Sequence, residues 1–259
     1  MKRMAGQSRV RPHTEATSLM ENEKMGCDIH PAIEFRQSAE MPWKALLNKN
    51  PHFGKYGDKK EMTASLHIDS DYDLFAVLGN VRNGSGFAGC DTGDGFDSIS
   101  DGRGVPDDIS DEAREALSGE HSATWVTLAE ILAFDWDRST KHRGWVNGIE
   151  FERWDRRKEW NPQPESWCGG ISGGDVEHIS EQEMRAKVKS IMGDARGPDW
   201  ETRLEQLKAR YASTYCLIQW ENSYTADTTQ MWTKILPKML NLGRQYGFDN
   251  VRLVMDFDS

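Results

Sequence analysis

The chain lacks any closely spaced pair of cysteines. Its 259 residues include four cysteines, at positions 27, 90, 168 and 216, and none forms a C-x-x-C motif. Two of them lie in apolar segments that resemble strands. This pattern indicates free buried thiols in a reducing compartment and argues against a disulfide framework or a zinc knuckle.

The chain also lacks a long apolar run and an excess of positive charge. No segment approaches the roughly 18 apolar residues that cross a membrane, and the basic N-terminus has no apolar stretch of a secretory signal. We therefore expect a cytoplasmic protein without a membrane partner. The net charge of -10 excludes non-specific binding to duplex nucleic acid, which needs a positive face. It permits a small nucleotide held by a few arginines, or a divalent metal bound by the surplus carboxylates.

The hydrophobic pattern predicts an α+β fold. Alternating apolar residues predict strands near 26–36, 144–154, 214–222 and 249–257, in a mixed or antiparallel sheet. Helical spacing predicts helices over 70–84, 124–137, 180–195, 199–212 and 225–247, with Pro237 kinking or breaking the last one. Residues 1–24 have few large apolar residues and are expected to be a disordered extension. Residues 25–259 are expected to form a single domain.

The first predicted strand carries the strongest candidate for a metal site. Alternation turns Cys27 towards the core and puts Asp28, His30 and Glu34 on the opposite face. Asp28 and His30 are then about 6–7 Å apart at the Cα level, because a strand rises ~3.3 Å per residue. Mixed nitrogen and oxygen ligands suit several divalent ions. Pro31 has no backbone donor, which predicts an edge or an interruption at that point.

Several segments resemble a family of uncharacterised proteins common in tailed-phage genomes. The resemblance rests on MGCDIH at 25–30, DYDLFAVLGNVRN at 71–83, GFAGCDTGDGFDSISDGRGVPDDISDE at 86–112, HSATWVTLAEIL at 121–132 and VRLVMDFD at 251–258. Members of the family begin at MGCDIH, which implies that Met25 is the older start. The resemblance covers 25–137 and the last ten residues, and it implies a phage accessory protein in the cytoplasm of a bacterial host. It carries no settled activity.

One departure from the family pattern bears on the metal site. Relatives often have Gly-His-Ser-His-Ser-Trp where this chain has Glu-His-Ser-Ala-Thr-Trp at 120–125. His121 matches the first histidine, and Ala123 replaces the second. We therefore expect His121, together with Asp28 and His30, to be the metal ligands.

A glycine-rich loop suggests where a phosphate binds. Residues 84–89 satisfy G-x-G-x-x-G, but a helix precedes them and a long loop follows, which excludes a dinucleotide-binding fold. A glycine-rich loop can nevertheless hold a phosphate through its N–H groups. Arg82, Asn83 and Arg103 flank the loop, and Trp125 can stack a base.

Two functions follow from these residues. The first is a metal-dependent phosphoesterase, in which Zn²⁺, Mn²⁺ or Mg²⁺ activates a water and Glu34 or Asp256 acts as a catalytic base or a ligand. Its substrate is then a small nucleotide, such as a signal of host defence. The second is a binding module without catalysis, which captures a nucleotide or a host protein.

Overall fold

The computed structural model describes residues 27–55, 59–84, 94–157, 161–166, 170–193 and 197–258. The predicted N-terminal extension and most of the glycine-rich loop, including 85–93, lie outside these residues. Helices and sheets are both present, and the predicted α+β class is confirmed.

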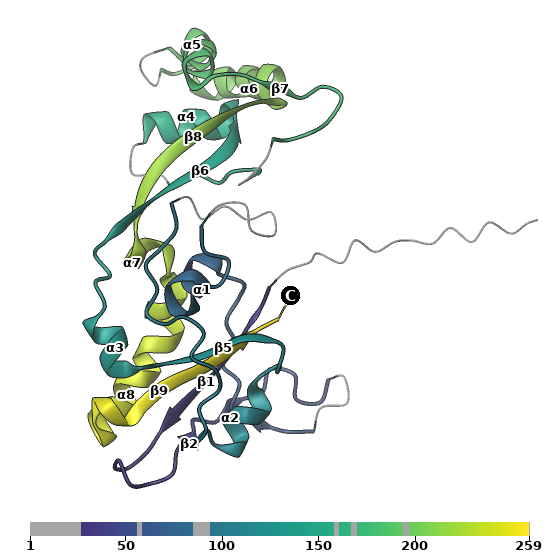
Figure 1. The fold of residues 1–259 in the computed structure, drawn as a ribbon. Coiled ribbons are helices and arrows are strands. Elements are labelled where there is room, and N and C mark those ends of the chain that lie inside the picture. Colours follow the sequence, from purple (N-terminus) through teal and green to yellow (C-terminus); the bar gives the residue numbers. More distant parts are fainter. Residues whose placement is uncertain are drawn as a thin grey trace, which may run out of the picture.

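A four-stranded antiparallel sheet brings the two ends of the described chain together. Strand β1 (Ile29–Phe35) pairs along its whole length with β9 (Val251–Phe257). The short β2 (Lys44–Ala45) follows on the outer side of β1, and β5 (His121–Thr127) lies on the far side of β9. The order is β2-β1-β9-β5, so that β1 and β9 form the centre of the sheet (Figure 1).

β1 runs through Pro31 without the predicted interruption, and it is not an edge strand of the sheet, although β2 does not reach Pro31 on its outer side. The Pro31 carbonyl accepts a hydrogen bond from the Leu66 N–H at 2.9 Å, and β2 pairs only with Glu34 and Phe35. The nitrogen and carbonyl of one strand residue point the same way, so Pro31 nitrogen faces the segment around Leu66. Its missing N–H therefore costs no hydrogen bond to β9.

Helices cover both faces of this sheet. Helices α1 (Tyr72–Gly79), α3 (Leu128–Ala133) and α8 (Leu236–Tyr246) pack on one face, where Cys27, as predicted, belongs to the main hydrophobic core. Helix α2 (Asp111–Ala116) packs on the other face over a smaller apolar cluster. The polar face predicted for β1 is therefore mostly covered.

A second lobe, residues 139–223, is built on a long hairpin. Strands β6 (Ser139–Asn147) and β8 (Thr214–Ser223) pair antiparallel along their length, and β7 (Glu177–His178) adds to β8 in parallel. Helices α4 (Gly148–Arg156), α5 (Glu181–Met192) and α6 (Trp200–Tyr211) cover it around a separate core. Figure 1 shows the hairpin rising away from the four-stranded sheet. The described residues thus form two large cores, and the expectation of a single domain stays a prediction.

The remaining elements are short. They are β3 (Asn48–Lys49), β4 (Met62–Thr63), α7 (Tyr224–Asp227), a π-helix over Met231–Ile235 and a 3₁₀-helix over Phe248–Asn250. Pro237 lies in the first turn of α8, but the π-helix leads directly into α8, so the chain stays helical across Pro237 and no break is found there. The helix expected over 225–247 is interrupted at Thr228 instead. Within the described residues, no helix is long and apolar enough to span a membrane.

Two predicted elements change type partway along. The strand expected over 144–154 ends at Asn147, whose side chain accepts hydrogen bonds from the N–H groups of Ile149 and Glu150 and so begins α4. The helix expected over 124–137 starts only after Thr127, which forms a reciprocal capping box with Glu130. In both cases a local cap ends the strand and starts a helix.

Candidate ligand-binding site

The structure places Asp28 and His30 beside the last described residue. His30 Nε2 lies 2.9 Å from Asp258 Oδ2, and Asp258 Oδ1 accepts the Asp28 N–H at 2.8 Å. The Asp28 carboxylate instead accepts the Ser70 hydroxyl at 2.6 Å. The partner of the His30 side chain is therefore the carboxylate of Asp258, which follows β9. The Asp28 side chain has a different partner, Ser70.

The Asp258–His30 pair predicts an acid-dependent loss of stability. Burial raises the pKa of Asp258, but the hydrogen bonds from His30 and the Asp28 backbone outweigh it and hold this pKa below the usual value. A carboxyl whose pKa is lower in the folded state than in the unfolded state stabilises the fold at pH values above its unfolded-state pKa. This contribution is lost as the pH falls through its folded-state pKa. Both side chains are 32% exposed, so screening by solvent keeps the effect below about 1 kcal/mol.

We expect the Asp258→Asn variant to lose less stability than the wild type between about pH 4 and pH 2, because it lacks this titration. Urea unfolding across the pH range measures the difference. Asp137→Asn, at an exposed turn residue, is the control and keeps the wild-type dependence. Parallel pH profiles for Asp258→Asn and the wild type would contradict the prediction.

His121 lies on the other face of the sheet. It pairs with Phe257 in the β5–β9 ladder, and the two rings stack with centroids 6.4 Å apart. The ladder is irregular between His121 and Thr124, and His121 Nδ1 lies 2.9 Å from the Ser122 hydroxyl. Within the described residues, His121 forms no metal-binding group with Asp28 and His30. The structure does not bring the three predicted ligands together.

The two predicted catalytic carboxylates are enclosed and fully engaged. Glu34 is 0% exposed; it accepts the Ser110 N–H at 2.7 Å and the Arg252 Nε–H at 2.8 Å. Asp256 is 1% exposed, and it accepts hydrogen bonds from both the backbone and the hydroxyl of Ser118 and from the Gly119 N–H. These contacts point to structural roles for both carboxylates, because neither is accessible to a water or a substrate.

Arg82 and Asn83 also serve the fold. Arg82 is buried, adopts φ of 52° and stacks over the Tyr72 ring at 5.1 Å. The Asn83 side chain donates to the Phe96 carbonyl at 2.7 Å and accepts the Phe96 N–H at 2.8 Å. Asn83 thereby ties the residues after α1 to those that follow the glycine-rich loop, and neither side chain is presented to a ligand.

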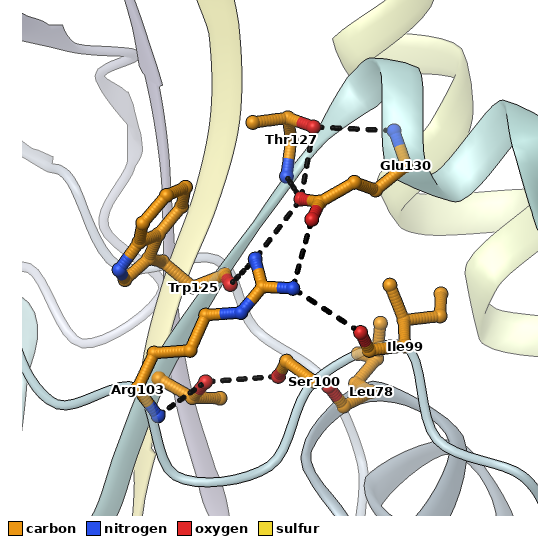
Figure 2. Close-up of polar contacts among 8 residues, drawn as sticks. Leu78, Ile99, Ser100, Arg103, Trp125, Thr127 and Glu130 are labelled. Carbon is orange, nitrogen blue, oxygen red and sulfur yellow. Dashed lines mark hydrogen bonds and ion pairs between the residues drawn. The ribbon is translucent and has the colours of Figure 1, made fainter.

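Arg103 is held in a defined position (Figure 2). Its guanidinium donates to both oxygens of Glu130, at 3.0 and 2.8 Å, and to the carbonyls of Trp125 and Ile99. Burial raises the pKa of Glu130, but the hydrogen bonds from Arg103 and Thr127 outweigh burial. The pKa of this carboxyl is therefore lower than usual, and the carboxyl stays charged. The guanidinium carbon lies 5.0 Å from the Trp125 ring centroid, which fixes Arg103 beside that ring.

Arg103 and Trp125 line an open cleft of about 640 Å³ near the start of β9. The lining residues are Arg36, Trp43, Arg103, Val105, Pro106, Asp107, Asp108, Trp125, Thr127, Asp249 and Arg252. The cleft thus brings two of the predicted substrate-binding residues together. The other two, Arg82 and Asn83, lie elsewhere.

Alternating arginines and tryptophans form one wall of the cleft. The Trp43 ring centroid lies 4.5 Å from the Arg36 guanidinium carbon and 4.0 Å from that of Arg252. Arg252 also lies 6.0 Å from the Trp125 ring, on whose surface Arg103 rests. Guanidinium groups stack favourably on indole rings, so these side chains support one another as an ordered wall of aromatic and guanidinium groups.

The three arginines of the cleft differ in their charge balance. Arg103 is paired with Glu130, and Arg252 is paired with Glu34 and Asp108. Arg36 donates instead to two neutral oxygens, those of the Asn250 side chain and the Ala39 carbonyl. Among the described residues, Arg36 forms no ion pair. Of the three guanidinium groups of the cleft, Arg36 is therefore the one that can bind an anion without breaking an existing ion pair.

Sequence reasoning missed three residues of this wall. Arg36 and Arg252 lie on the polar faces that alternation predicts for the first and last strands, but nothing local marks them as neighbours. Trp43 follows Pro42 in a segment without periodicity. Only the β1–β9 register, which pairs Glu34 with Arg252, brings them together.

A second group of polar residues was also not predicted. Asp73, His142 and Asp227 lie together between the four-stranded sheet and the second lobe. Burial, and next the charge of Asp227, raise the pKa of Asp73 to about 7. Each residue belongs to a different element, and no short motif joins them in the sequence.

Comparisons of the chain with family models, with curated proteins and with solved structures give no match. The assignment of a function therefore depends on the geometry of the chain's own residues.

Proposed function

We propose that this protein binds a small nucleotide in the cleft between Trp43 and Trp125. The observation that carries the proposal is the wall of alternating arginine and tryptophan side chains. A nucleotide combines an aromatic base with an anionic phosphate, and this wall offers partners for both. The volume of about 640 Å³ falls within the range typical of small-molecule sites.

Trp125 provides the aromatic contact for the base, at the part of its ring that Arg103 and Arg252 leave exposed. Its ring is half-buried, and its backbone is fixed in β5 opposite Val254. Stacking of a base on an aromatic side chain contributes about 1–3 kcal/mol. Trp43 is 8% exposed, with arginines close to its ring, so it supports the wall and contacts the ligand less.

Arg36 receives the phosphate. Its side chain is half-buried, and within the described residues it forms no ion pair, although the Glu40 carboxylate lies close enough to feel its charge. Arginine binds phosphate oxygens in a bidentate manner. Arg103 and Arg252 are already neutralised by carboxylates, and their part is to position the two indole rings.

Capture fits this site better than hydrolysis. The carboxylates expected to act as bases, Glu34 and Asp256, are enclosed on the covered face of the sheet. The resemblance to tailed-phage proteins supports the role of an accessory protein that sequesters a nucleotide signal of host defence. The proposed ligand-binding module thus replaces the phosphoesterase as the favoured function.

Calorimetric titration with 5′-AMP, a cyclic dinucleotide and inorganic phosphate tests this proposal. We expect at least one nucleotide to bind, and to be recovered unchanged. Arg36→Gln should weaken binding roughly tenfold through the loss of a charge-assisted hydrogen bond, and Trp125→Ala by a similar factor. Arg210→Gln, at an exposed residue of α6, is the matched control and should bind as the wild type does.

Two outcomes would reject the proposal. One is the absence of binding by any of the nucleotides at millimolar concentration. The other is equal affinity of the wild type, Arg36→Gln and Trp125→Ala, which would locate the ligand elsewhere. Conversion of the bound nucleotide to a product would reject capture and restore the phosphoesterase.

A further inference from the structure

Three elements bring metal-ligating side chains to one point at the base of the second lobe. Asp73 comes from the first turn of α1, His142 from β6 and Asp227 from α7. One ligand atom from each lies within 4.8 Å of the others. Figure 1 shows α1 and α7 near the foot of the β6–β8 hairpin. The group therefore joins parts of the fold that belong to different cores.

The imidazole at the centre of this group is held firmly. His142 is 2% exposed, and its ring stacks on Trp220 with centroids 5.5 Å apart. Its Nε2 atom lies 2.7 Å from Asp227 Oδ2, and Asp227 Oδ1 accepts the Asn222 amide at 2.6 Å. Asp227 is thus oriented by a hydrogen bond from outside the group, as metal ligands commonly are, and His142 is oriented by its stacking on Trp220.

The third side chain has no such partner. Within the described residues, no hydrogen bond or ion pair reaches the Asp73 carboxylate, although it is half-buried and lies beside Asp227. Two carboxylates around one imidazole leave an excess of negative charge in a region of low dielectric. A divalent cation offsets that excess and gives Asp73 a partner.

We propose that Asp73, His142 and Asp227 bind one divalent cation of the Zn²⁺ or Mn²⁺ class. Binding breaks the hydrogen bond between His142 Nε2 and Asp227 Oδ2: the proton between them leaves to solvent and Nδ1 carries the proton of the neutral imidazole, so that Nε2 and Oδ2 both become ligands. An imidazole ligand favours these ions over Ca²⁺ and Mg²⁺, which prefer oxygen ligands alone. The site differs from the one predicted at Asp28, His30 and His121, and it does not depend on the nucleotide cleft.

Titration of the full chain, after dialysis against EDTA, with ZnCl₂ and with MnCl₂ tests the proposal. We expect one ion per chain and a higher thermal midpoint in its presence. Asp73→Asn should weaken binding by about 100-fold or more, because it removes a charged ligand. It breaks no hydrogen bond among the described residues, so the variant should fold without metal. Asp137→Asn makes the same charge change at an exposed position and should bind as the wild type does.

Three results would overturn the proposal. The first is a wild-type chain that binds neither ion, which would mean that Asp73 is simply protonated beside a His142–Asp227 hydrogen bond. The second is an Asp73→Asn variant that binds as tightly as the wild type. The third is loss of binding in Asp28→Asn with full binding in Asp73→Asn, which would locate the ion on β1. None of these results bears on the nucleotide titration, since the cleft variants leave the three ligands unchanged.

Discussion

Replacing Arg252 by leucine should lower the free energy of unfolding by about 3–5 kcal/mol, the loss typical of a buried ion pair that loses one partner. The side chains of Arg252 and Glu34 are 4% and 0% exposed, and their contact measures 2.8 Å. Without the guanidinium, the Glu34 carboxylate stays buried with only the Ser110 N–H to balance its charge. Urea unfolding at neutral pH without nucleotide measures the loss.

The double variant Arg252→Leu with Glu34→Leu is the control for this effect. The double variant removes both charges. Its loss of unfolding free energy should therefore be smaller than the sum of the losses in the two single variants, by about 1–3 kcal/mol. A loss below about 1 kcal/mol in Arg252→Leu would contradict the assignment, because surface pairs show losses of that size. Additive losses in the double variant would show that the two side chains act independently.

Replacing Asp256 by alanine should cause the second largest loss of unfolding free energy. The carboxylate accepts hydrogen bonds from the Ser118 N–H, the Ser118 hydroxyl and the Gly119 N–H, at 3.0, 3.0 and 2.6 Å. These bonds hold the turn between α2 and β5 against the centre of the sheet. Because hydrogen bonds to a charged group contribute more than neutral ones, we expect a loss of about 2–3 kcal/mol in unfolding free energy.

The same variant separates a role of Asp256 in stability from a role in ligand binding. Nucleotide affinity in the cleft should stay within about twofold of the wild type where the chain is folded, because Asp256 does not line the cleft. Asp258→Asn, whose parent side chain is 32% exposed, is the matched control and should lose much less stability. An Asp256→Ala variant with wild-type stability would contradict this role.

The central sheet could be predicted from local pattern, because alternation is a local property. Residues 27–35 and 251–257 alternate clearly and form β1 and β9. The segments 124–137 and 144–154 are each predicted as one element, although each holds the end of a strand followed by a helix. Thr127 and Asn147 cap those helices, and a cap inside an apolar segment is a weak signal beside periodicity.

The candidate sites depended on contacts that no local pattern contains. His30 is adjacent to Asp28 in the predicted face, but its partner is Asp258, 228 residues away. The sequence suggests Glu34 as a base because Arg252, which neutralises it, lies 218 residues away. Arg103 and Trp125 do line one cleft, and their role in binding stays a prediction. Asp73, His142 and Asp227 could not be grouped without the packing of α1 against α7 at the foot of the hairpin.

The pairing of β1 with β9 has a consequence for how the chain folds during synthesis. Ile29 pairs with Phe257, so the central ladder cannot form until nearly all the residues between them have been made. All strand pairs of the second lobe lie within residues 139–223, so this lobe can fold first. Until β9 is made, the edge of β1 that later pairs with β9 stays unpaired. Long-range strand pairing is slow, and unpaired strands aggregate. The period in which the nascent chain most needs a chaperone is therefore the interval before β9 emerges from the ribosome.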